Sequence, residues 1–459
     1  MTTENDGAVD VTYCEGWDPL VRAAVGPIPE LVAGGRDASG EPYAVLLSVQ
    51  GSPKALFQVD WGHGHLGLFL FDKCARRTRE WEYRQLEPGR LHLLRYQEWR
   101  HASDAEAEFP ERGWRFTMTI DPDGRARQVL SDVGGSRHTS ASVPGEYRSV
   151  AKAKFGAWTA YVDAQMLGLS GPITLVPAHT PAEGPARGTM PVWSAPLPLR
   201  PRNLEALFTP GSRLASDDGR VALITEPSHA GRLHLPTGSL IAADPFYLDD
   251  SAPFTVTVAP GDYAVLIATM RWEGTAWEGE TPAAMVRILD QPTASWELAL
   301  LPGEDVRLLG DGEFYGFGVD AGMGCFLDAS GRDEFAKLIE QWEEKPNPEV
   351  DLLAAEVHAP ETGTNLIAYQ SGWGDGSYPV WIGRNADGEV TSFVADMLIL
   401  NDADALPPTA PSTAVCLLLH SSVTDDRREA PFTSPTATAE FMAAQITKAT
   451  DGWAEHRRV

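Results

Sequence analysis

Short runs in which apolar and polar residues alternate recur along the chain, and they predict β-strands. From Trp114 to Ile120 every second residue is apolar, so these side chains fall on one face of a strand, and the Asp–Pro–Asp–Gly sequence at 121–124 predicts a hairpin turn. Because strands joined by tight turns pair antiparallel, we expect a mainly β (α+β) fold of antiparallel sheets with a few peripheral helices. Further strands are predicted over residues 43–49, 67–71, 254–258, 263–268, 286–289, 296–301, 380–383 and 389–394.

Turn sequences predict which of these strands pair in the second half. Ala–Pro–Gly–Asp at 259–262 would join strands 254–258 and 263–268, and Asp387–Gly388 would join strands 380–383 and 389–394. Both pairs are therefore expected to be β-hairpins.

Two segments depart from the strand pattern and predict helices. From Phe335 to Trp342, apolar residues recur at i, i+3, i+4 and i+7, so a helix over 334–342 is expected to lay one apolar stripe on a sheet face. Near the C-terminus, the Ser–Pro pair at 434–435 has the form of a cap followed by a first-turn proline. A terminal helix is therefore predicted there.

A proline-rich stretch divides the chain. Between Pro177 and Pro201, five further prolines are interleaved with two glycines, and neither a helix nor a central strand continues through such a composition. The length of 459 residues agrees with more than one domain. We expect a β-rich N-terminal domain over 1–176, a linker over 177–202, an acidic β-rich domain over 203–405 and a C-terminal extension with the terminal helix over 406–459.

Charge is distributed unevenly along the sequence. The chain has 64 acidic and 37 basic residues, of which residues 1–200 hold 24 and 21, so the remainder holds 40 and 16. The net charge is thus −3 for the first part and −24 for the second. Such a field repels nucleic acid and anionic membranes and attracts a basic protein, so we expect no nucleic-acid or membrane partner and a basic protein partner. Solubility is the other explanation for an acidic surface, and of the two it is the favoured one.

The ends and the cysteines indicate a compartment. The N-terminus is acidic and polar, without the basic start and apolar run of a secretory signal, and no apolar run is long enough to span a membrane. We therefore expect a cytoplasmic location. The four cysteines form no CxxC pair and are expected to be free thiols; they are Cys14, Cys74, Cys325 and Cys416.

Five segments of the second half carry a resemblance to a known family. They are GRLHLPTGSLIAADPF (231–246), PFTVTVAPGDYAVLIA (253–268), WELALLPGED (296–305), FYGFGVDAGMGCFLD (314–328) and SGWGDGSYPVWIGRNADGEVTSFVADMLIL (371–400). In order, spacing and residue identity, these segments resemble the motifs of the bacterial domain-of-unknown-function family 4241 over about residues 231–400. The resemblance implies a compact, mainly β domain of bacterial cytoplasmic proteins, and it brings no established activity.

Three aspartates in the glycine-rich segments are candidate metal ligands. Asp320 and Asp328 bracket one such segment and Asp375 lies in another, so three carboxylates that converged would suit Mg²⁺ or Ca²⁺, which prefer oxygen ligands. The protein would then be a divalent-metal-dependent hydrolase. The alternative is that these aspartates stabilise turns and a helix cap, and it is favoured because their spacing matches no EF-hand loop. No other cofactor is expected.

One cysteine and two histidines are weaker candidates for chemistry. Cys325 would be nucleophilic if a histidine such as His358 or His420 approached it, but a buried, inert thiol is the favoured interpretation. In His63–Gly64–His65, alternate spacing would place both imidazoles on one face of a strand near Asp60. A zinc site there needs a further ligand, so plain turn positions are favoured.

Aromatic residues in the glycine-rich segments are the candidate binding surface. Trp373, Asp375 and Tyr378 lie in SGWGDGSYP, and Tyr315 lies in another such segment. Exposed, these aromatics would anchor a partner; buried, they would be core, and Trp373 and Tyr378 are left open between the two.

The motifs of well-known enzyme classes do not occur in the sequence. It contains no GxxxxGK[ST], Rossmann, HExxH or GxSxG signature, so enzymatic activity is uncertain and the balance is against it. Our hypothesis is a cytoplasmic, non-enzymatic binding protein whose acidic, glycine- and aromatic-rich loops meet a basic partner. An immunity-type role, in which the protein neutralises a basic toxin, is one case of this hypothesis.

Overall fold

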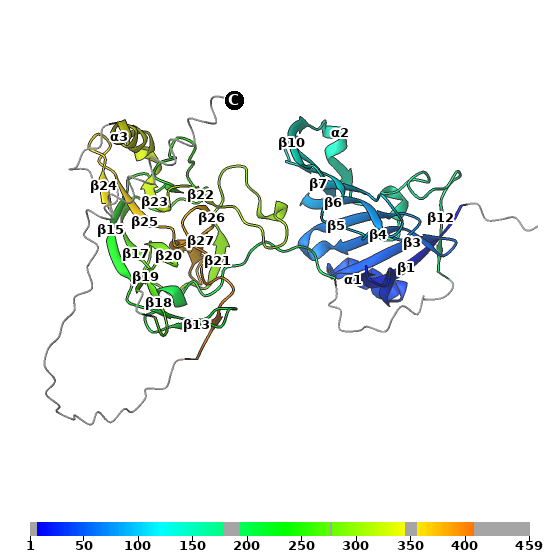
Figure 1. Cartoon of the computed structure of the whole chain (residues 1–459), viewed down its shortest axis with the longest axis horizontal. Helices are drawn as coiled ribbons and strands as arrows, with labels where there is room; N and C mark the ends of the chain where they lie inside the picture. Colours follow the sequence, from blue (N-terminus) through cyan, green and yellow to red (C-terminus); the bar gives the residue numbers. More distant parts are fainter. Residues whose placement is uncertain (1–6, 179–192, 276–277, 345–355, 408–459) are drawn as a thin grey trace, which may run out of the picture. The chain divides into compact units, whose positions relative to one another are not determined.

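The computed structural model describes residues 7–178, 193–275, 278–344 and 356–407, and it is mainly β (Figure 1). Within these residues the strands form five sheets, and every pair of neighbouring strands is antiparallel except β1 and β12. The predicted fold class is therefore confirmed. Strands from residues 8–177 form one sheet, and strands from residues 213–405 form the other four. The predicted terminal helix lies outside the described residues.

The N-terminal part, residues 7–178, is built on a twelve-stranded sheet. Its order is β10-β9-β8-β7-β6-β5-β4-β3-β1-β12, with β2 paired to β1 and β11 paired to β7, so most neighbours in space are neighbours in sequence. The strands are β1 Ala8–Asp18, β2 Ala23–Pro27, β3 Tyr43–Val49, β4 Ser52–Asp60, β5 His65–Phe71, β6 Arg77–Glu87, β7 Arg90–Arg100, β8 Trp114–Ile120, β9 Arg125–Asp132, β10 Gly135–Ser142, β11 Ser149–Ala151 and β12 Thr174–Pro177.

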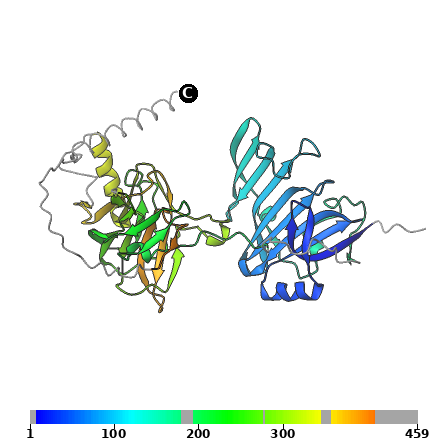
Figure 2. The ribbon, with the colours of Figure 1, turned by 60° about the horizontal axis from the view of Figure 1, so that its bottom comes forward.

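The two faces of this sheet carry different residues. Tyr43 and Phe57 are fully buried on one face, where they pack with Trp158 from a short 3₁₀ turn and with Ala33 of helix α1 (Glu30–Ser39). Figure 2 shows α1 as the blue helix along one side of the sheet. The alternate residues face the other way and form a smaller apolar cluster that includes Leu56. The period of two that predicted these strands thus separates two buried layers.

The C-terminal part, residues 193–407, contains four smaller sheets. Their orders are β15-β17-β20-β28-β27-β21, β19-β18-β14-β13-β29, β16-β23-β25-β24 and β22-β26. The strands are β13 Arg213–Ala215, β14 Val221–Ile224, β15 Ser228–Leu235, β16 Leu240–Ala243, β17 Gly261–Ile267, β18 Met270–Trp272, β19 Glu278–Glu280, β20 Ala283–Arg287, β21 Ser295–Leu298, β22 Phe317–Val319, β23 Met323–Asp328, β24 Glu356–His358, β25 Asn365–Gln370, β26 Gly376–Tyr378, β27 Val380–Arg384, β28 Val390–Asp396 and β29 Asp404–Ala405.

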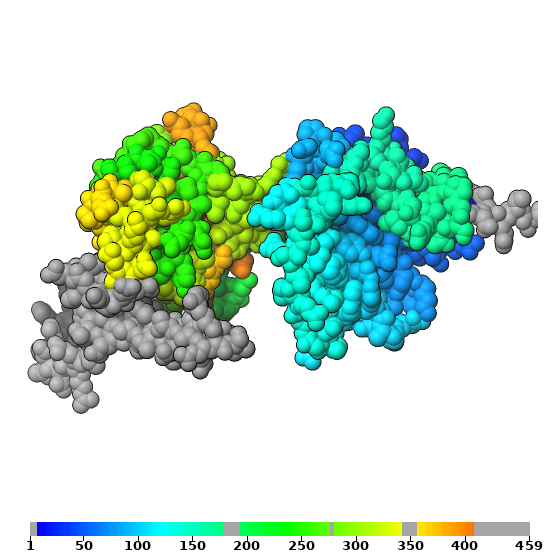
Figure 3. Space-filling view, turned by 90° about the horizontal axis from the view of Figure 1, so that it is seen from above, coloured from blue at the N-terminus to red at the C-terminus, as the bar shows by residue number. Residues whose placement is uncertain are grey.

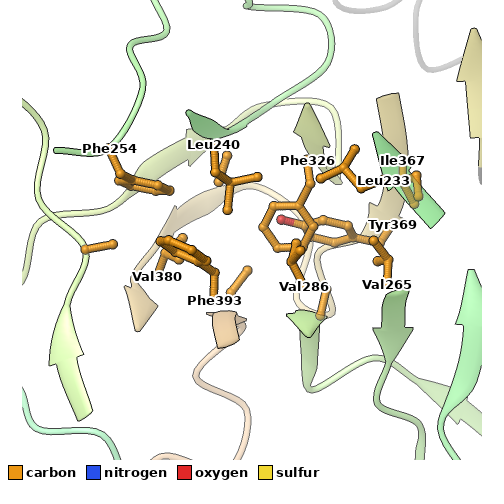
Figure 4. Close-up of a cluster of buried hydrophobic side chains, with 14 of the residues drawn as sticks. Leu233, Leu240, Phe254, Val265, Val286, Phe326, Ile367, Tyr369, Val380 and Phe393 are labelled. Carbon is orange, nitrogen blue, oxygen red and sulfur yellow. The ribbon is translucent and has the colours of Figure 1, made fainter. Parts of the chain in front are cut away.

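The main core of this part lies between the six-stranded and four-stranded sheets. Val286 pairs with Val265 on one side and with Phe393 on the other, which sets an apolar row across the six-stranded sheet. Phe326 and Tyr369 of the four-stranded sheet pack against this row (Figure 4). The arrangement is a sandwich of two sheets with an apolar interior.

Outer layers cover the far faces of this sandwich. Helix α3 (Arg332–Glu344) buries Phe335 and Ile339 against the four-stranded sheet, as the apolar stripe predicts. The side chain of Trp342 lies outside the described residues. On the other side, Leu214 and Trp272 of the five-stranded sheet pack against Trp381 of the six-stranded sheet.

Some predicted strands are corrected by the structure. Residues 254–258 form no strand, because their backbone bonds run to three separate segments: Phe254 N–H to Leu240, Thr255 N–H to Leu300 and Val258 N–H to Gly238. The predicted hairpin with 263–268 is therefore wrong, and β17 pairs instead with β15 and β20. The second hairpin, β27–β28, is confirmed.

The sequence predicts no membrane-spanning segment and four free thiols. Across the described ranges, no helix is long and apolar enough to cross a membrane. Cys14, Cys74 and Cys325 are free thiols, as predicted, and Cys416 lies outside the described residues.

Candidate functional site

Two glycine-rich loops meet at the end of the two-stranded sheet β22-β26. Val319 pairs with Gly376, so Asp320 and Asp375 occupy the next opposed positions, one on each chain segment, and both are exposed. A second bond continues the contact, because Ser371 N–H donates to the Gly322 carbonyl at 3.1 Å. We call residues 320–322 and 371–375 the paired loops.

Glycine and two hydroxyl groups fix the shape of the longer loop. Gly372 has φ +64°, and a Cβ there would lie 2.8 Å from the carbonyl oxygen of Thr281, so no other residue fits without a shift. The hydroxyls of Ser371 and Tyr378 both donate to the Gly374 carbonyl, at 2.8 and 2.9 Å. The loop therefore holds Trp373 outward, with 65% of its surface exposed.

A buried carboxylate supports the shorter loop. Asp244 follows β16 and is 1% exposed; its Oδ2 accepts the backbone N–H groups of Asp320 (2.8 Å) and Ala321 (2.9 Å). Burial raises the pKa of Asp244, and these hydrogen bonds oppose the rise. Tyr247, three residues on, donates from its hydroxyl to Oδ2 of Asp320 at 2.9 Å. Asp244 thus holds the backbone of the shorter loop, and Tyr247 holds the side chain of Asp320.

The surface around the paired loops is acidic and aromatic. Tyr247 is 56% exposed, and Asp249 and Asp250 on the same segment are exposed as well. Among the residues that the structure describes, no Lys, Arg or His forms an ion pair within 4.0 Å of Asp249, Asp250, Asp320 or Asp375. We call Tyr247, Asp320, Trp373 and Asp375, which belong to the paired loops or contact them, the acidic aromatic surface.

The three predicted metal ligands are not brought together. Asp328 lies at the other end of β23 from the paired loops and is 0% exposed. Its carboxylate accepts from the backbone N–H and hydroxyl of Thr237 (3.0 and 2.8 Å) and of Ser330 (2.9 and 2.6 Å). It therefore acts as the turn and cap residue that was the favoured alternative. Within the described ranges, no group of three or more His, Cys, Asp or Glu side chains could hold a metal ion.

The predicted binding residues separate into two kinds. Trp373 and Asp375 are exposed, as a binding surface requires. Tyr378 is only 4% exposed and packs in the core, so it shapes the loop and does not face a partner. Tyr315 is half-buried, and its hydroxyl donates to the Asp305 carbonyl at 3.3 Å. Burial is the physical reason for correcting Tyr378, whereas Tyr315 is partly accessible and its hydroxyl is taken up by the Asp305 carbonyl.

Cys325 has the environment of a core thiol. It is 0% exposed in the middle of β23, and burial raises its pKa well above the usual range. Of the two histidines considered as its base, His358 is exposed on β24 and lies 3.4 Å from Glu356, and His420 lies outside the described residues. The favoured interpretation, an inert thiol, agrees with these observations.

The two neighbouring histidines do not share a strand face. His63 ends a 3₁₀ turn (Trp61–His63), and its Nδ1 lies 2.8 Å from Oδ2 of Asp60, which caps that turn. His65 begins β5, where it is buried against Arg84. An arginine can only donate, so Nδ1 of His65 accepts; burial, then Arg84, lowers its pKa well below the usual range. His65 is thus a neutral core residue.

A buried charged cluster beside His65 escaped the sequence reasoning. Glu82 and Arg84 are 1% and 3% exposed, and Glu82 Oε1 lies 2.6 Å from Arg84 Nη2. Oε2 of Glu82 lies 2.5 Å from Nη2 of Arg95 on the adjacent strand, opposite in the register. The sequence does show charged residues at alternate positions of β6, which place them on one face of the strand. Only the pairing register shows that Glu82 lies opposite Arg95 of β7.

The comparisons with known proteins add one finding. Residues 233–395 match a family described as a protein of unknown function (DUF4241). The match begins within β15 and ends within β28, so it contains Asp244, Tyr247 and both paired loops. It covers the region in which the sequence resembles that family. No curated protein and no solved structure matched the chain.

Proposed function

We propose that this DUF4241-containing protein is a cytoplasmic, non-enzymatic binding protein, and that its acidic aromatic surface takes a basic protein partner. The observation that carries the proposal is that Asp320 and Asp375, which adjoin the last paired residues of β22 and β26, are exposed carboxylates without an ion-pair partner in the described structure, on the same paired loops as exposed Trp373. Neutralisation of a basic toxin is the immunity-type case of this function. Its motive is the net charge of −24 beyond residue 200.

The chemistry of this surface suits Lys and Arg side chains of a partner. Carboxylates accept charge-assisted hydrogen bonds from guanidinium and ammonium groups, and the open face of Trp373 adds a cation–π contact. Tryptophan and tyrosine also dominate the residues that contribute most to binding energy at interfaces. Because the hydrogen bonds to Asp244 and Gly374 hold both loops in place, little conformational entropy is lost on binding.

The alternative, a divalent-metal hydrolase, lacks an observation in its favour. Asp320 and Asp375 adjoin the paired residues Val319 and Gly376, but the carboxylate of Asp328 accepts hydrogen bonds from Thr237 and Ser330 at the far end of β23. Two exposed carboxylates without further ligands are a poor site for Mg²⁺ or Ca²⁺. We therefore do not propose it.

Capture of the partner from lysate of the source organism tests the proposal. The full chain is immobilised and washed at low and at high salt, and the retained proteins are identified by mass spectrometry. The same experiment is run with a chain carrying Asp320→Asn, Trp373→Ala and Asp375→Asn. A matched control carries Asp217→Asn and Asp387→Asn, two exposed acids in other turns of the same part.

The two variants separate a specific surface from general acidity. We expect a basic protein that wild type and control retain at low salt, that high salt releases, and that the surface variant loses. Equal loss in the control would mean that net charge alone binds, and equal retention by all three chains would overturn the assignment of this surface.

A further inference from the structure

We propose that an open cavity in the N-terminal part binds the phosphate group of a small anionic ligand. The cavity has a volume of about 280 Å³ and lies where β7 begins, beside the β8–β9 turn and residues 145–149. Arg90 and Arg148 both line it, together with Ser149 and His92. This inference concerns other residues than the acidic aromatic surface and does not depend on the function proposed for it.

Arg148 is held in the cavity wall by backbone groups. Its Nη1 donates to the Pro122 carbonyl at 2.7 Å. A Cβ on Gly124 would lie 3.0 Å from that nitrogen, and a Cβ on Gly145 would lie 3.3 Å from Nη2. The guanidinium group therefore occupies space that two missing side chains leave open. Only one of its five N–H groups has a hydrogen bond within the described structure, so the others are available to a ligand.

Arg90 is held in a similar way by a neutral partner. Its Nη2 contacts the hydroxyl oxygen of Ser149, and Ser149 pairs with His92 in the β11–β7 ladder. Within the ranges that the structure describes, no carboxylate lies within 4.0 Å of the guanidinium nitrogens of Arg90 or Arg148. Both guanidinium groups are thus held without a carboxylate in direct contact, while Asp123 of the adjoining β8–β9 turn interacts electrostatically with Arg148 at longer range, in a chain whose net charge is −27.

The other polar residues of the wall set the charge of the cavity. His92 donates from Nε2 to the Ile120 carbonyl at 2.9 Å; burial and then Arg148 lower its pKa, so it is neutral at pH 7. Glu87 also lines the cavity and carries one negative charge. Among the lining residues, two arginines and one glutamate leave a net charge of +1, and Asp121 and Asp123 of the adjoining turn act electrostatically on His92 and Arg148.

The geometry favours an oxyanion over an apolar ligand. Guanidinium groups present planar pairs of N–H donors that match the oxygens of phosphate, and the Ser149 hydroxyl adds a further polar group. The volume lies at the lower end of ligand pockets, so it admits a small molecule and not an extended polymer. A phosphate group carried by a small metabolite meets both conditions.

Titration calorimetry with inorganic phosphate on the full chain tests this site. Phosphate is compared with chloride at equal ionic strength, so that screening of surface charge gives no signal. The variants are Arg90→Gln and Arg148→Gln. The matched control is Arg137→Gln, an exposed arginine of β10 that lies outside the cavity wall and has no ion pair with a described residue. Circular dichroism checks that every variant is folded.

We expect saturable binding of one phosphate by wild type and by Arg137→Gln. Each cavity variant should weaken binding at least tenfold, because each removes half of the positive charge in the wall. The absence of saturable binding by wild type would overturn the proposal. Equal weakening in Arg137→Gln would overturn it as well, since phosphate would then respond to net charge and not to this cavity.

Discussion

The hydroxyl of Tyr247 donates a 2.9 Å hydrogen bond to Asp320, a residue 73 positions further along the chain. Three residues before this tyrosine, buried Asp244 accepts the backbone N–H of the same aspartate. One short segment therefore fixes an exposed carboxylate from two sides. The surface thus divides into residues that shape the paired loops, among them Asp244 and Tyr247, and exposed residues that would contact a partner, namely Trp373 and Asp375.

Trp373→Ala tests the exposed side of this division. Because 65% of the Trp373 surface is accessible, its removal should change the free energy of unfolding by no more than about 0.5 kcal/mol. Retention of the basic partner should nevertheless fall sharply. Urea denaturation and the capture experiment measure the two effects separately, and a large loss of stability would show that this indole is part of the core.

Tyr378→Phe tests the buried side. The substitution keeps the ring in the core and removes the hydroxyl that donates to the Gly374 carbonyl at 2.9 Å. We expect a loss of about 1 kcal/mol of stability, the usual contribution of such a hydrogen bond. Partner retention should weaken only as far as the loop loosens. Denaturation that matches wild type would contradict the role given to this hydroxyl.

Asp328→Ala should cost more, and metal ions should not change the result. The carboxylate accepts hydrogen bonds from Thr237 and Ser330 and is fully buried, so its removal leaves several donors without a partner. A loss of roughly 2 kcal/mol or more in unfolding free energy follows. Mg²⁺ and Ca²⁺ should leave the melting temperature of wild type unchanged. A metal-induced rise that Asp375→Asn abolishes would instead support the hydrolase alternative.

The strands that local pattern could predict are those whose partner is near in sequence. The strand over 43–49 coincides with β3 and that over 114–120 with β8, because alternation and an adjacent turn determine them. Residues 254–258 have the same alternation but no ladder, since their backbone partners come from distant segments. Local pattern indicates that a chain is extended; it does not indicate what the chain pairs with.

The candidate site shows the same limit at the level of single residues. Asp328 was identifiable as a cap from the helix that follows it, and Trp373 and Asp375 were identifiable from the glycines around them. Asp244 was not, because its role comes from hydrogen bonds to a segment 76 residues away. Tyr247 was missed for the same reason. Long-range contacts of this kind leave no periodic signal in the sequence.

Glu82→Gln tests the buried charged cluster of the N-terminal sheet. The substitution keeps the shape of the side chain and leaves Arg84, which is 3% exposed, without its counter-ion. We expect a loss of about 3 kcal/mol in unfolding free energy, as for other buried pairs that lose one partner. The loss should persist at high salt, because buried charges are poorly screened. Glu111→Gln, an exposed change of equal charge, serves as the control and should have little effect.

The raised pKa of buried Asp396 leads us to predict a specific dependence of folding stability on pH. Asp396 ends β28, is 3% exposed and accepts the Leu398 N–H at 2.9 Å. Burial raises its pKa from 3.8 to about 6, and that hydrogen bond only partly opposes the rise. The folded protein therefore holds this proton more tightly than the unfolded chain does.

The direction of this pH dependence follows from the difference in proton affinity between the folded and the unfolded chain. The stability that this group contributes is fully present below pH 4 and is lost as pH rises through 6, so between pH 5 and pH 7 it falls by on the order of 1 kcal/mol. Buried His65, whose pKa is lowered, acts in the opposite direction, which makes wild type alone uninformative. Asp396→Asn removes only the first effect, so the stability difference between wild type and variant isolates it. Urea denaturation at pH 5 and pH 7 should show wild type gaining relative to the variant at the lower pH. A difference independent of pH would mean that Asp396 titrates near its ordinary pKa and that its site is open to water.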